Sequence, residues 1–325
     1  MIALDTIDTR LLDEFQRGFP LEPRPFARIG LELGVEEGAV LDRLTRLSAG
    51  GAVARVGATV RPNTAGASTL AALAVPKGRL EEVAALVGAE SGVNHSYQRE
   101  ADWNLWFVAT AADERALAQS LERIRKTTGL RLLDLRLERA YNIDLGFRLS
   151  GLPRAMGVTA EARPEVLRPD DRPLLHALSQ GFVLVPTPYA ALADRLGRTE
   201  GQVLSRIGLL VSAGIITRLG VIVRHRPLGW TANAMVVWDL PEARIDAAGQ
   251  ALAGHAGVTL CYRRRRVPGV WPYALYCMIH GKSRDATLEV LEAGRLLPAL
   301  QGAALRVLFS TRCFKQSGAR LVEAA

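Results

Sequence analysis

The chain has 325 residues, of which 49% are hydrophobic and 23% charged, which is enough for two or more folded domains. Its formal net charge of +8 favours an anionic partner, either nucleic acid or a polycarboxylate or phosphate ligand, although arginine bias is also typical of a GC-rich genome. No apolar run approaches the ~20 residues of a membrane-spanning helix, and no basic segment leads into an apolar one at the N-terminus, so we expect neither a membrane span nor a secretory signal.

The three cysteines, Cys261, Cys277 and Cys313, lie far apart and lack CxxC spacing. This pattern argues against a disulfide framework and against a zinc site. It is typical of the reducing cytoplasm, and we therefore predict a cytoplasmic protein.

Over about fifty residues at the start of each copy, the chain repeats itself at a constant spacing of 163 residues without a gap. Glycines, prolines and arginines coincide at this spacing: Pro25 with Pro188, Gly34 with Gly197, Gly51 with Gly214 and Arg55 with Arg218. Chance does not produce so many matches in one register. The sequence therefore indicates a tandem duplication.

Each copy begins with three predicted helices, in which apolar residues such as Val40, Leu44 and Leu47 recur at helical spacing. The helices are expected near residues 6–17, 25–33 and 37–48, and near residues 171–180, 188–196 and 200–212. Residues 52–61 and 215–224 follow them, and their β-branched, alternating pattern predicts a wing hairpin in each copy. Three helices and a wing make a winged helix-turn-helix.

The remainder of each copy is predicted to run strand, helix, strand, strand, helix, strand. This order is typical of a ferredoxin-like βαββαβ domain. The strands are expected near residues 69–75, 92–98, 104–110 and 130–138, and near residues 233–239, 257–264, 273–280 and 303–310; the helices are expected near residues 79–88, 113–127, 242–254 and 284–295. The predicted fold class is therefore α+β, a tandem duplication of a winged helix-turn-helix plus a ferredoxin-like domain.

The predicted boundaries follow from this repeat. Residues 1–62 and 169–226 are the winged helices, residues 63–148 and 227–325 are the ferredoxin-like domains, and residues 149–168 form a linker without apolar periodicity. The same layout is that of the Lrp/AsnC transcription regulators, which makes DNA binding the main rival function. However, the first recognition helix begins with Glu36 and Glu37, whose carboxylates would repel phosphates, and the second begins with a mixed set at residues 198–202. We therefore interpret the winged helices as scaffold and do not expect DNA as a partner.

Polar residues concentrate in the central hairpin of each ferredoxin-like domain. Strand alternation places His95, Tyr97 and Arg99 on one face and puts other polar side chains on the opposite face, namely Asn94, Ser96 and Gln98. A covered strand should be apolar on at least one face. A strand that is polar on both faces indicates a functional site.

The two hairpins also resemble one enzyme family. His-Ser-Tyr-Gln-Arg-Glu at residues 95–100 and Trp-Asn-Leu-Trp-Phe-Val at residues 103–108 are similar to the NirD-type half of the siroheme decarboxylases of the Lrp/AsnC superfamily. Cys-Tyr-Arg-Arg at residues 261–264 and Trp-Pro-Tyr-Ala-Leu-Tyr-Cys-Met-Ile-His-Gly at residues 271–281 are similar to the NirL-type half. Both halves in this order resemble the fused NirDL form, and the resemblance covers the chain apart from the linker.

The two halves differ at positions that matter. Tyr97 and Arg99 align with tyrosine and arginine, but His95 aligns with Leu260, and Thr110 aligns with His280. An alanine also stands at position 274, where the first half has an asparagine. The halves are therefore not expected to be functionally equivalent.

The resemblance implies a lyase that removes CO2 without oxidation from two ring acetates of siroheme, giving 12,18-didecarboxysiroheme in haem d1 or alternative haem biosynthesis. The conjugated ring can stabilise the carbanion-like carbon that remains. We therefore expect no cofactor beyond the substrate's own iron and no metal site in the protein.

The chemistry indicates which residue types are needed. Histidine can deliver a proton near neutral pH, so His95 and His225 are the predicted catalytic residues. Arginine forks bind carboxylates through paired, charge-assisted hydrogen bonds, and aromatic residues can line a tetrapyrrole site. The predicted substrate-binding residues are Tyr97, Arg99, Arg224, Tyr262, Arg263, Arg264, Arg265, Trp271 and His280.

Other interpretations of these residues stay open. His95 could make a structural hydrogen bond or an axial contact to the iron, and His280 could be a core histidine. Alternation puts Arg264 and Arg266 on the same face of the strand as Tyr262. It puts Arg263 and Arg265 on the opposite face, so at least one pair should face solvent. The tryptophans are typical of a core or a ring-stacking surface.

Two rival functions remain on the same skeleton. One is a tetrapyrrole-responsive Lrp/AsnC-type regulator that binds DNA, and the other is a non-catalytic tetrapyrrole carrier. The sequence also leaves open which half is active and whether two fused chains associate further.

Overall fold

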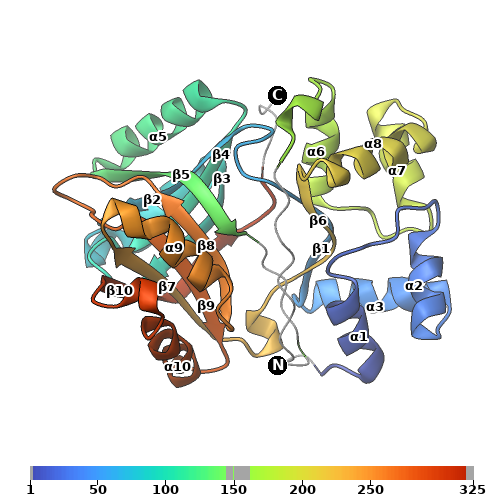
Figure 1. Cartoon of the computed structure of the whole chain (residues 1–325). Coiled ribbons are helices and arrows are strands. Elements are labelled where there is room, and N and C mark those ends of the chain that lie inside the picture. The colour runs from blue at the N-terminus through green and yellow to red at the C-terminus, as the bar shows by residue number, and fades with distance from the viewer. Residues whose placement is uncertain (1–2, 144–148, 150–161, 320–325) are drawn as a thin grey trace. The chain divides into compact units, whose positions relative to one another are not determined.

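The computed structural model describes residues 3–143, 149 and 162–319 (Figure 1). Most of the predicted linker, residues 150–161, lies outside the described residues. The chain divides into two compact units that cut across the repeat. Residues 1–65 and 146–229 form one unit, which we call the helix unit, and residues 66–145 and 230–325 form the other, which we call the barrel unit.

The helix unit contains the three predicted helices of each copy, and local chemistry sets their ends. Asp5 caps the first helix with its side chain. Pro25 and Pro188 stand at the start of the second helix of each copy, where a missing N–H costs nothing, and Gly34 and Gly197 end these helices in the left-handed conformation. The helices are α1 (Thr6–Glu14), α2 (Pro25–Leu33), α3 (Glu37–Ala49), α6 (Asp171–Gln180), α7 (Pro188–Leu196) and α8 (Glu200–Ser212).

The prediction of a wing hairpin in each copy is wrong. Each copy contributes a single strand here, β1 (Val53–Val60) or β6 (Ile216–Val223), and these two strands pair with each other in an antiparallel two-stranded sheet. The error has a physical cause, because alternation and β-branching identify a strand but do not identify the strand with which it pairs. The two copies therefore share one sheet.

Two glycines allow the copies to interlock. Gly57 faces Gly220 in the register of β1 and β6. A Cβ atom at Gly57 would lie 2.4 Å from the carbonyl oxygen of Leu178, and one at Gly220 would lie 2.4 Å from that of Phe15. The N–H of Val221 donates to the same Phe15 oxygen at 2.8 Å. The backbone of each strand is therefore in direct contact with the C-terminal end of the other copy's first helix.

Gly57→Ala and Gly220→Ala are each expected to lower the free energy of unfolding by about 1–3 kcal/mol, because the added methyl group would overlap a backbone carbonyl. Scanning calorimetry of the full chain should show a lower Tm. Gly38→Ala in α3 is the matched control, since a Cβ there meets no atom within 4 Å and alanine favours a helix over glycine. If the strand variants kept the Tm of the wild type, the close packing of β1 and β6 would be refuted.

The barrel unit contains two βαββαβ segments, as predicted. The first consists of β2 (Ala67–Leu73), η1 (Lys77–Arg79), α4 (Leu80–Ala89), β3 (Val93–Arg99), β4 (Leu105–Ala111), α5 (Glu114–Thr128) and β5 (Leu132–Asn142). The second consists of β7 (Ala232–Asp239), α9 (Glu242–Ala253), β8 (Val258–Arg264), β9 (Leu275–Gly281), α10 (Arg284–Arg295), η4 (Pro298–Leu300) and β10 (Ala304–Gln316). No helix of the described residues is long and apolar enough to cross a membrane.

The two segments close into one eight-stranded barrel, in the order β10-β3-β4-β2-β5-β8-β9-β7. The last strand of each copy makes this closure. β5 pairs with β2 of its own copy through Leu132–Arg136 and then with β8 of the second copy, and β10 pairs first with β7 and then with β3 of the first copy. Both strands are therefore longer at their C-terminal ends than the sequence predicted.

Strand alternation gives the barrel two apolar layers. On the outer face, residues such as Leu73 and Phe107 pack against the helices, which lie outside the barrel in Figure 1. On the inner face, side chains from both copies form one cluster, which includes Trp106, Leu135 and Tyr276. The interior of the barrel is therefore built jointly by the two copies.

Candidate active site

Two arginine–tyrosine pairs occupy equivalent strands of the barrel. In β3, the guanidinium carbon of Arg99 lies 5.8 Å from the centre of the Tyr97 ring, and in β8 that of Arg264 lies 4.9 Å from the Tyr262 ring. Tyr97 stands opposite Trp106, which belongs to the inner cluster, and Tyr262 packs against the same cluster. Because side chains alternate along a strand, both arginines also face the interior. The interior therefore holds two cationic positions beside aromatic rings.

Each of these arginines is held by a strand of the other copy. Nη1 of Arg99 donates to the carbonyl oxygen of Leu308 in β10 at 3.0 Å, and Nη1 of Arg264 donates to that of Leu135 in β5 at 2.9 Å. The acceptors lie in the strands that close the barrel. The position of each guanidinium therefore depends on the pairing of the two copies.

The second pair is suited to an anionic ligand. Burial lowers the pKa of Arg264 and raises the pKa of Tyr262 to about 12. Arginine nevertheless stays protonated near neutral pH, so Arg264 is a half-buried cation and Tyr262 is a neutral phenol that can donate a hydrogen bond. Nε of Arg264 is buried and has no hydrogen-bond partner among the described residues. A carboxylate is a strong acceptor for such a group.

His95 lies at a bulge in β3, where strict alternation fails. Val93 pairs with Ala109 and His95 with Val108, so Asn94 is the extra residue. Its Oδ1 lies 2.6 Å from Nδ1 of the half-buried His95 ring. The prediction that Asn94 and His95 point to opposite faces therefore misses their contact, because the bulge brings the two side chains together. The His95 ring also stacks on Tyr97, with 6.4 Å between the ring centres.

The second copy has the same bulge with different residues. Thr259 is the extra residue, because Val258 pairs with Ile279 and Leu260 with Met278. Its hydroxyl oxygen lies 2.8 Å from Nδ1 of His280, and Nε2 of His280 lies 2.7 Å from the side-chain nitrogen of Asn233. His280 is thus buried with both ring nitrogens in hydrogen bonds. The sequence pointed to His280 but did not identify Asn233 or Thr259, because neither stands in the polar runs.

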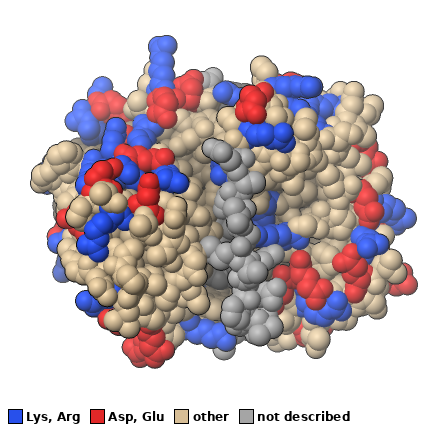
Figure 2. All heavy atoms as spheres, viewed as in Figure 1, with Lys and Arg blue, Asp and Glu red and all other residues tan. Residues whose placement is uncertain are grey.

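The structure does not bring Arg263 and Arg265 together with Arg264. Arg263 is ion-paired with Glu138 at 2.7 Å and also with Glu242, and Arg265 lies 3.4 Å from Asp134. These pairs lie on the outer surface, and Figure 2 shows other basic and acidic side chains next to each other on the face it presents.

Trp271 is part of the inner core of the barrel. Its ring centre lies 5.3 Å from that of Trp106, and its indole nitrogen donates to the hydroxyl of Tyr276 at 2.7 Å. The side chain is only 1% exposed. This geometry agrees with the core interpretation that the sequence left open.

Known proteins match the whole chain. Residues 65–142 and 227–315 match the family AsnC-like ligand binding domain, and residues 8–53 and 171–216 match the siroheme decarboxylase NirDL-like HTH domain. Over 324 residues the chain is 60% identical to the siroheme decarboxylase NirDL subunit of Paracoccus denitrificans (strain Pd 1222), with 100% of both chains covered. The chain belongs to the siroheme decarboxylase NirDL family.

Two crystal structures of the family share this fold. That of the siroheme decarboxylase NirDL has 28% identity and a TM-score of 0.69, covering 97% of this chain and 94% of that chain. A second, of the siroheme decarboxylase NirDL in co-complex with an iron-uroporphyrin III analogue, has 27% identity and a TM-score of 0.67, covering 97% and 93%. The predicted duplication and family are confirmed.

The other predicted catalytic histidine of this NirDL family member belongs to the helix unit. His225 follows β6 and precedes the short helix η3 (Arg226–Leu228), and Arg224 stands beside it. Burial and, to a lesser extent, the charge of Arg226 lower the pKa of His225 to about 4. At neutral pH its ring is therefore unprotonated, which is unfavourable for a proton donor.

Acidification is expected to destabilise the helix unit through His225. Its pKa in the folded protein lies below the ordinary value of 6.5, so the unfolded chain binds the proton more readily. The stability contributed by the neutral ring is complete above pH 6.5 and is lost as the pH falls towards 4. The Tm of His225→Gln, measured from pH 7 to pH 4, should fall less steeply than that of the wild type. Identical slopes would contradict a lowered pKa.

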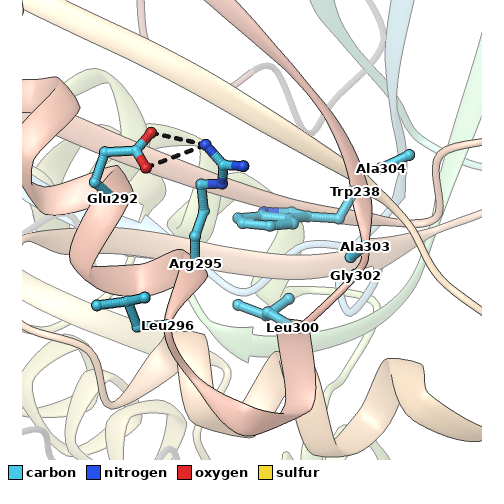
Figure 3. Close-up of a pocket in the computed structure, with 8 residues that line it drawn as sticks. All are labelled: Trp238, Glu292, Arg295, Leu296, Leu300, Gly302, Ala303 and Ala304. Atoms are coloured by element: carbon cyan, nitrogen blue, oxygen red, sulfur yellow. Dashed lines mark hydrogen bonds and ion pairs between the residues drawn. The ribbon is translucent and has the colours of Figure 1, made fainter.

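A separate cavity of about 400 Å³ opens in the barrel unit (Figure 3). It is lined by Trp238, Glu292, Arg295, Leu296, Leu300, Gly302, Ala303 and Ala304. Arg295 is ion-paired with Glu292 at 3.0 Å, so its charge is already balanced. The lining includes none of the residues that the sequence predicted for the site in this family.

Proposed function

We propose that this chain is a siroheme decarboxylase. The observation that carries the proposal is the 60% identity to the siroheme decarboxylase NirDL subunit of Paracoccus denitrificans over the full length of both chains. A related NirDL structure holds an iron-uroporphyrin III analogue, which has the carboxylate-bearing tetrapyrrole frame that such a substrate requires. We infer that siroheme is the substrate here and that its iron arrives with it.

The reaction removes a carboxylate from a ring acetate. The bond between the methylene carbon and the carboxylate carbon breaks, CO2 leaves, and the electron pair stays on the methylene carbon, where the conjugated ring stabilises it. A proton then forms the new C–H bond and turns the acetate into a methyl group. No oxidant or reductant is consumed, so the proposal includes no cofactor beyond the substrate itself. Repetition at a second acetate would give 12,18-didecarboxysiroheme, a step towards haem d1 or another haem.

The interior residues supply what this reaction needs from the protein. Arg99 is a buried cation and Arg264 a half-buried one, and the Nε–H of Arg264, which is itself buried, is available to a carboxylate. His95 is the better candidate for the proton donor, because it is half-buried and its ring stacks on Tyr97, the ring that Arg99 also contacts. His225, whose pKa is lowered to about 4, is the weaker candidate. Arg224, Arg263, Arg265, Trp271 and His280 stay predicted ligands, without a contact that supports them. We further propose a cytoplasmic location, the compartment in which free thiols persist.

Anaerobic incubation of the purified chain with siroheme tests the proposal directly. Mass spectrometry of the extracted tetrapyrrole should show the loss of two CO2 units, and His95→Ala should lower kcat by roughly 100-fold to 10,000-fold, the usual contribution of a general acid. An unchanged mass with tight siroheme binding would overturn the enzyme and leave a tetrapyrrole-responsive regulator or a carrier. Sequence-specific DNA binding with a steep salt dependence would then identify the regulator.

Arg264→Lys is expected to weaken siroheme binding about tenfold or more. Lysine keeps the charge but cannot offer a planar fork, and a hydrogen bond to a charged group contributes about 1.5–3 kcal/mol. The Kd can be measured by anaerobic absorbance titration. Arg125→Lys is the matched control, because it makes the same change on the outer surface of α5, where Arg125 is ion-paired with Glu122 at 2.7 Å. Equal losses in both variants would show that the interior position of Arg264 is not what binds siroheme.

A further inference from the structure

The bulge in β3 connects His95 to a short chain of hydrogen bonds. Oδ1 of Asn94 lies 2.6 Å from Nδ1 of His95, and Nδ2 of Asn94 lies 3.3 Å from the hydroxyl oxygen of Thr110 in β4. That hydroxyl lies 3.4 Å from the carbonyl oxygen of Gly92. Asn94 is 4% exposed and Thr110 is 9% exposed, so these contacts are shielded from water.

The direction of each bond follows from the last acceptor. A carbonyl oxygen cannot donate, so the hydroxyl of Thr110 donates to Gly92. Its oxygen then accepts from the amide nitrogen of Asn94, which turns the amide oxygen of Asn94 towards His95. An amide oxygen only accepts, and Nδ1 of His95 must therefore carry a hydrogen. The chain of bonds thereby assigns the tautomer of His95.

We propose that Asn94, itself oriented by Thr110, is a positioning residue that holds His95 in the Nδ1–H form and presents Nε2 as the nitrogen that gives the proton. The inference rests on the proposed function for its catalytic consequence, though not for the tautomer. When Nε2 of the imidazolium gives its proton to the methylene carbon, the neutral ring that remains is the Nδ1–H form. Asn94 accepts from Nδ1 both before and after the transfer, so no bond in the chain has to reverse.

The second copy has an equivalent bulge but no histidine at the position of His95. Thr259 takes the place of Asn94 in the equivalent bulge, Leu260 that of His95, and His280 that of Thr110. The imidazole has moved to the neighbouring strand, where both of its nitrogens are engaged. Both copies have the same bulge, but among the described residues only the first copy has a histidine in the bulged strand, next to the amide acceptor. We infer that proton delivery belongs to the first copy.

The tautomer can be measured on the full chain without substrate. The protein has five histidines, so ¹⁵N NMR of histidine-labelled protein is tractable, and His95→Gln identifies the His95 signals. The wild type is expected to show His95 with a protonated Nδ1 when the ring is neutral. Asn94→Ala should lose that preference, and Asn94→Asp, which keeps an acceptor, should restore it. Thr259→Ala is the matched control from the second copy and should leave the His95 signals unchanged.

Kinetic measurements on the same variants distinguish a role of Asn94 in positioning His95 from a role in binding siroheme. Asn94→Ala should lower kcat roughly tenfold to 100-fold, by analogy with the loss of the hydrogen-bond partner of a metal-bound histidine, while the Kd for siroheme stays the same. Asn94→Asp should recover most of the loss.

The outcomes distinguish the two hypotheses. A wild-type His95 that carries its hydrogen on Nε2, or a tautomer that is the same in Asn94→Ala, overturns the inference even if no variant is active. A second outcome is that the Nδ1–H tautomer depends on Asn94 but the protein leaves siroheme unchanged. That result would support the positioning role of Asn94 and refute the proposed decarboxylase activity.

Discussion

The pairing of each copy's last strand with the other copy is the interaction on which the site depends. β5 and β10 begin in their own sheets and end beside β8 and β3. Without these pairings the sheets would be open, and the unpaired edges of β3 and β8 would carry the site residues into solvent. The closure also supplies the carbonyl groups of Leu135 and Leu308 that hold the two arginines. Fusion of the copies makes this pairing intramolecular, so it does not depend on protein concentration.

The barrel keeps a symmetric frame while its chemistry has become asymmetric. Tyrosine and arginine occupy equivalent positions in β3 and β8, and both strands carry the same bulge. The histidines differ, because His95 stands in the bulged strand of the first copy and His280 in the neighbouring strand of the second. A frame that is held by backbone hydrogen bonds tolerates such changes of side chain. Duplication thus allows one copy to specialise while the other preserves the shape of the interior.

The sequence predicted the elements of this fold better than the contacts between them. Helix ends at Asp5, Gly34 and Gly197 depend on neighbours in the chain, so local patterns identify them. The partner of β1 and the extra length of β5 and β10 depend on the other copy, and no local pattern records them. The bulge at Asn94 was missed for a similar reason, since a single unpaired residue leaves the run of alternating residues unchanged. Arg263 and Arg264 are adjacent and identical in type, and only pairing and burial separate a surface ion pair from an interior cation.

Arg264 shows how function limits the stability of such an interior. A guanidinium that is half-buried beside Tyr262, with its buried Nε–H unused, lowers stability, because water solvates the charge less well and no carboxylate replaces it. Apolar residues would fill the same space at less cost. Two other arginines have a carboxylate partner: Arg206 is buried with Asp171, and Arg263 is paired with Glu138. Arg264 gains a carboxylate acceptor only when an anionic ligand binds. The interaction that is missing from the folded protein therefore contributes to the free energy of binding.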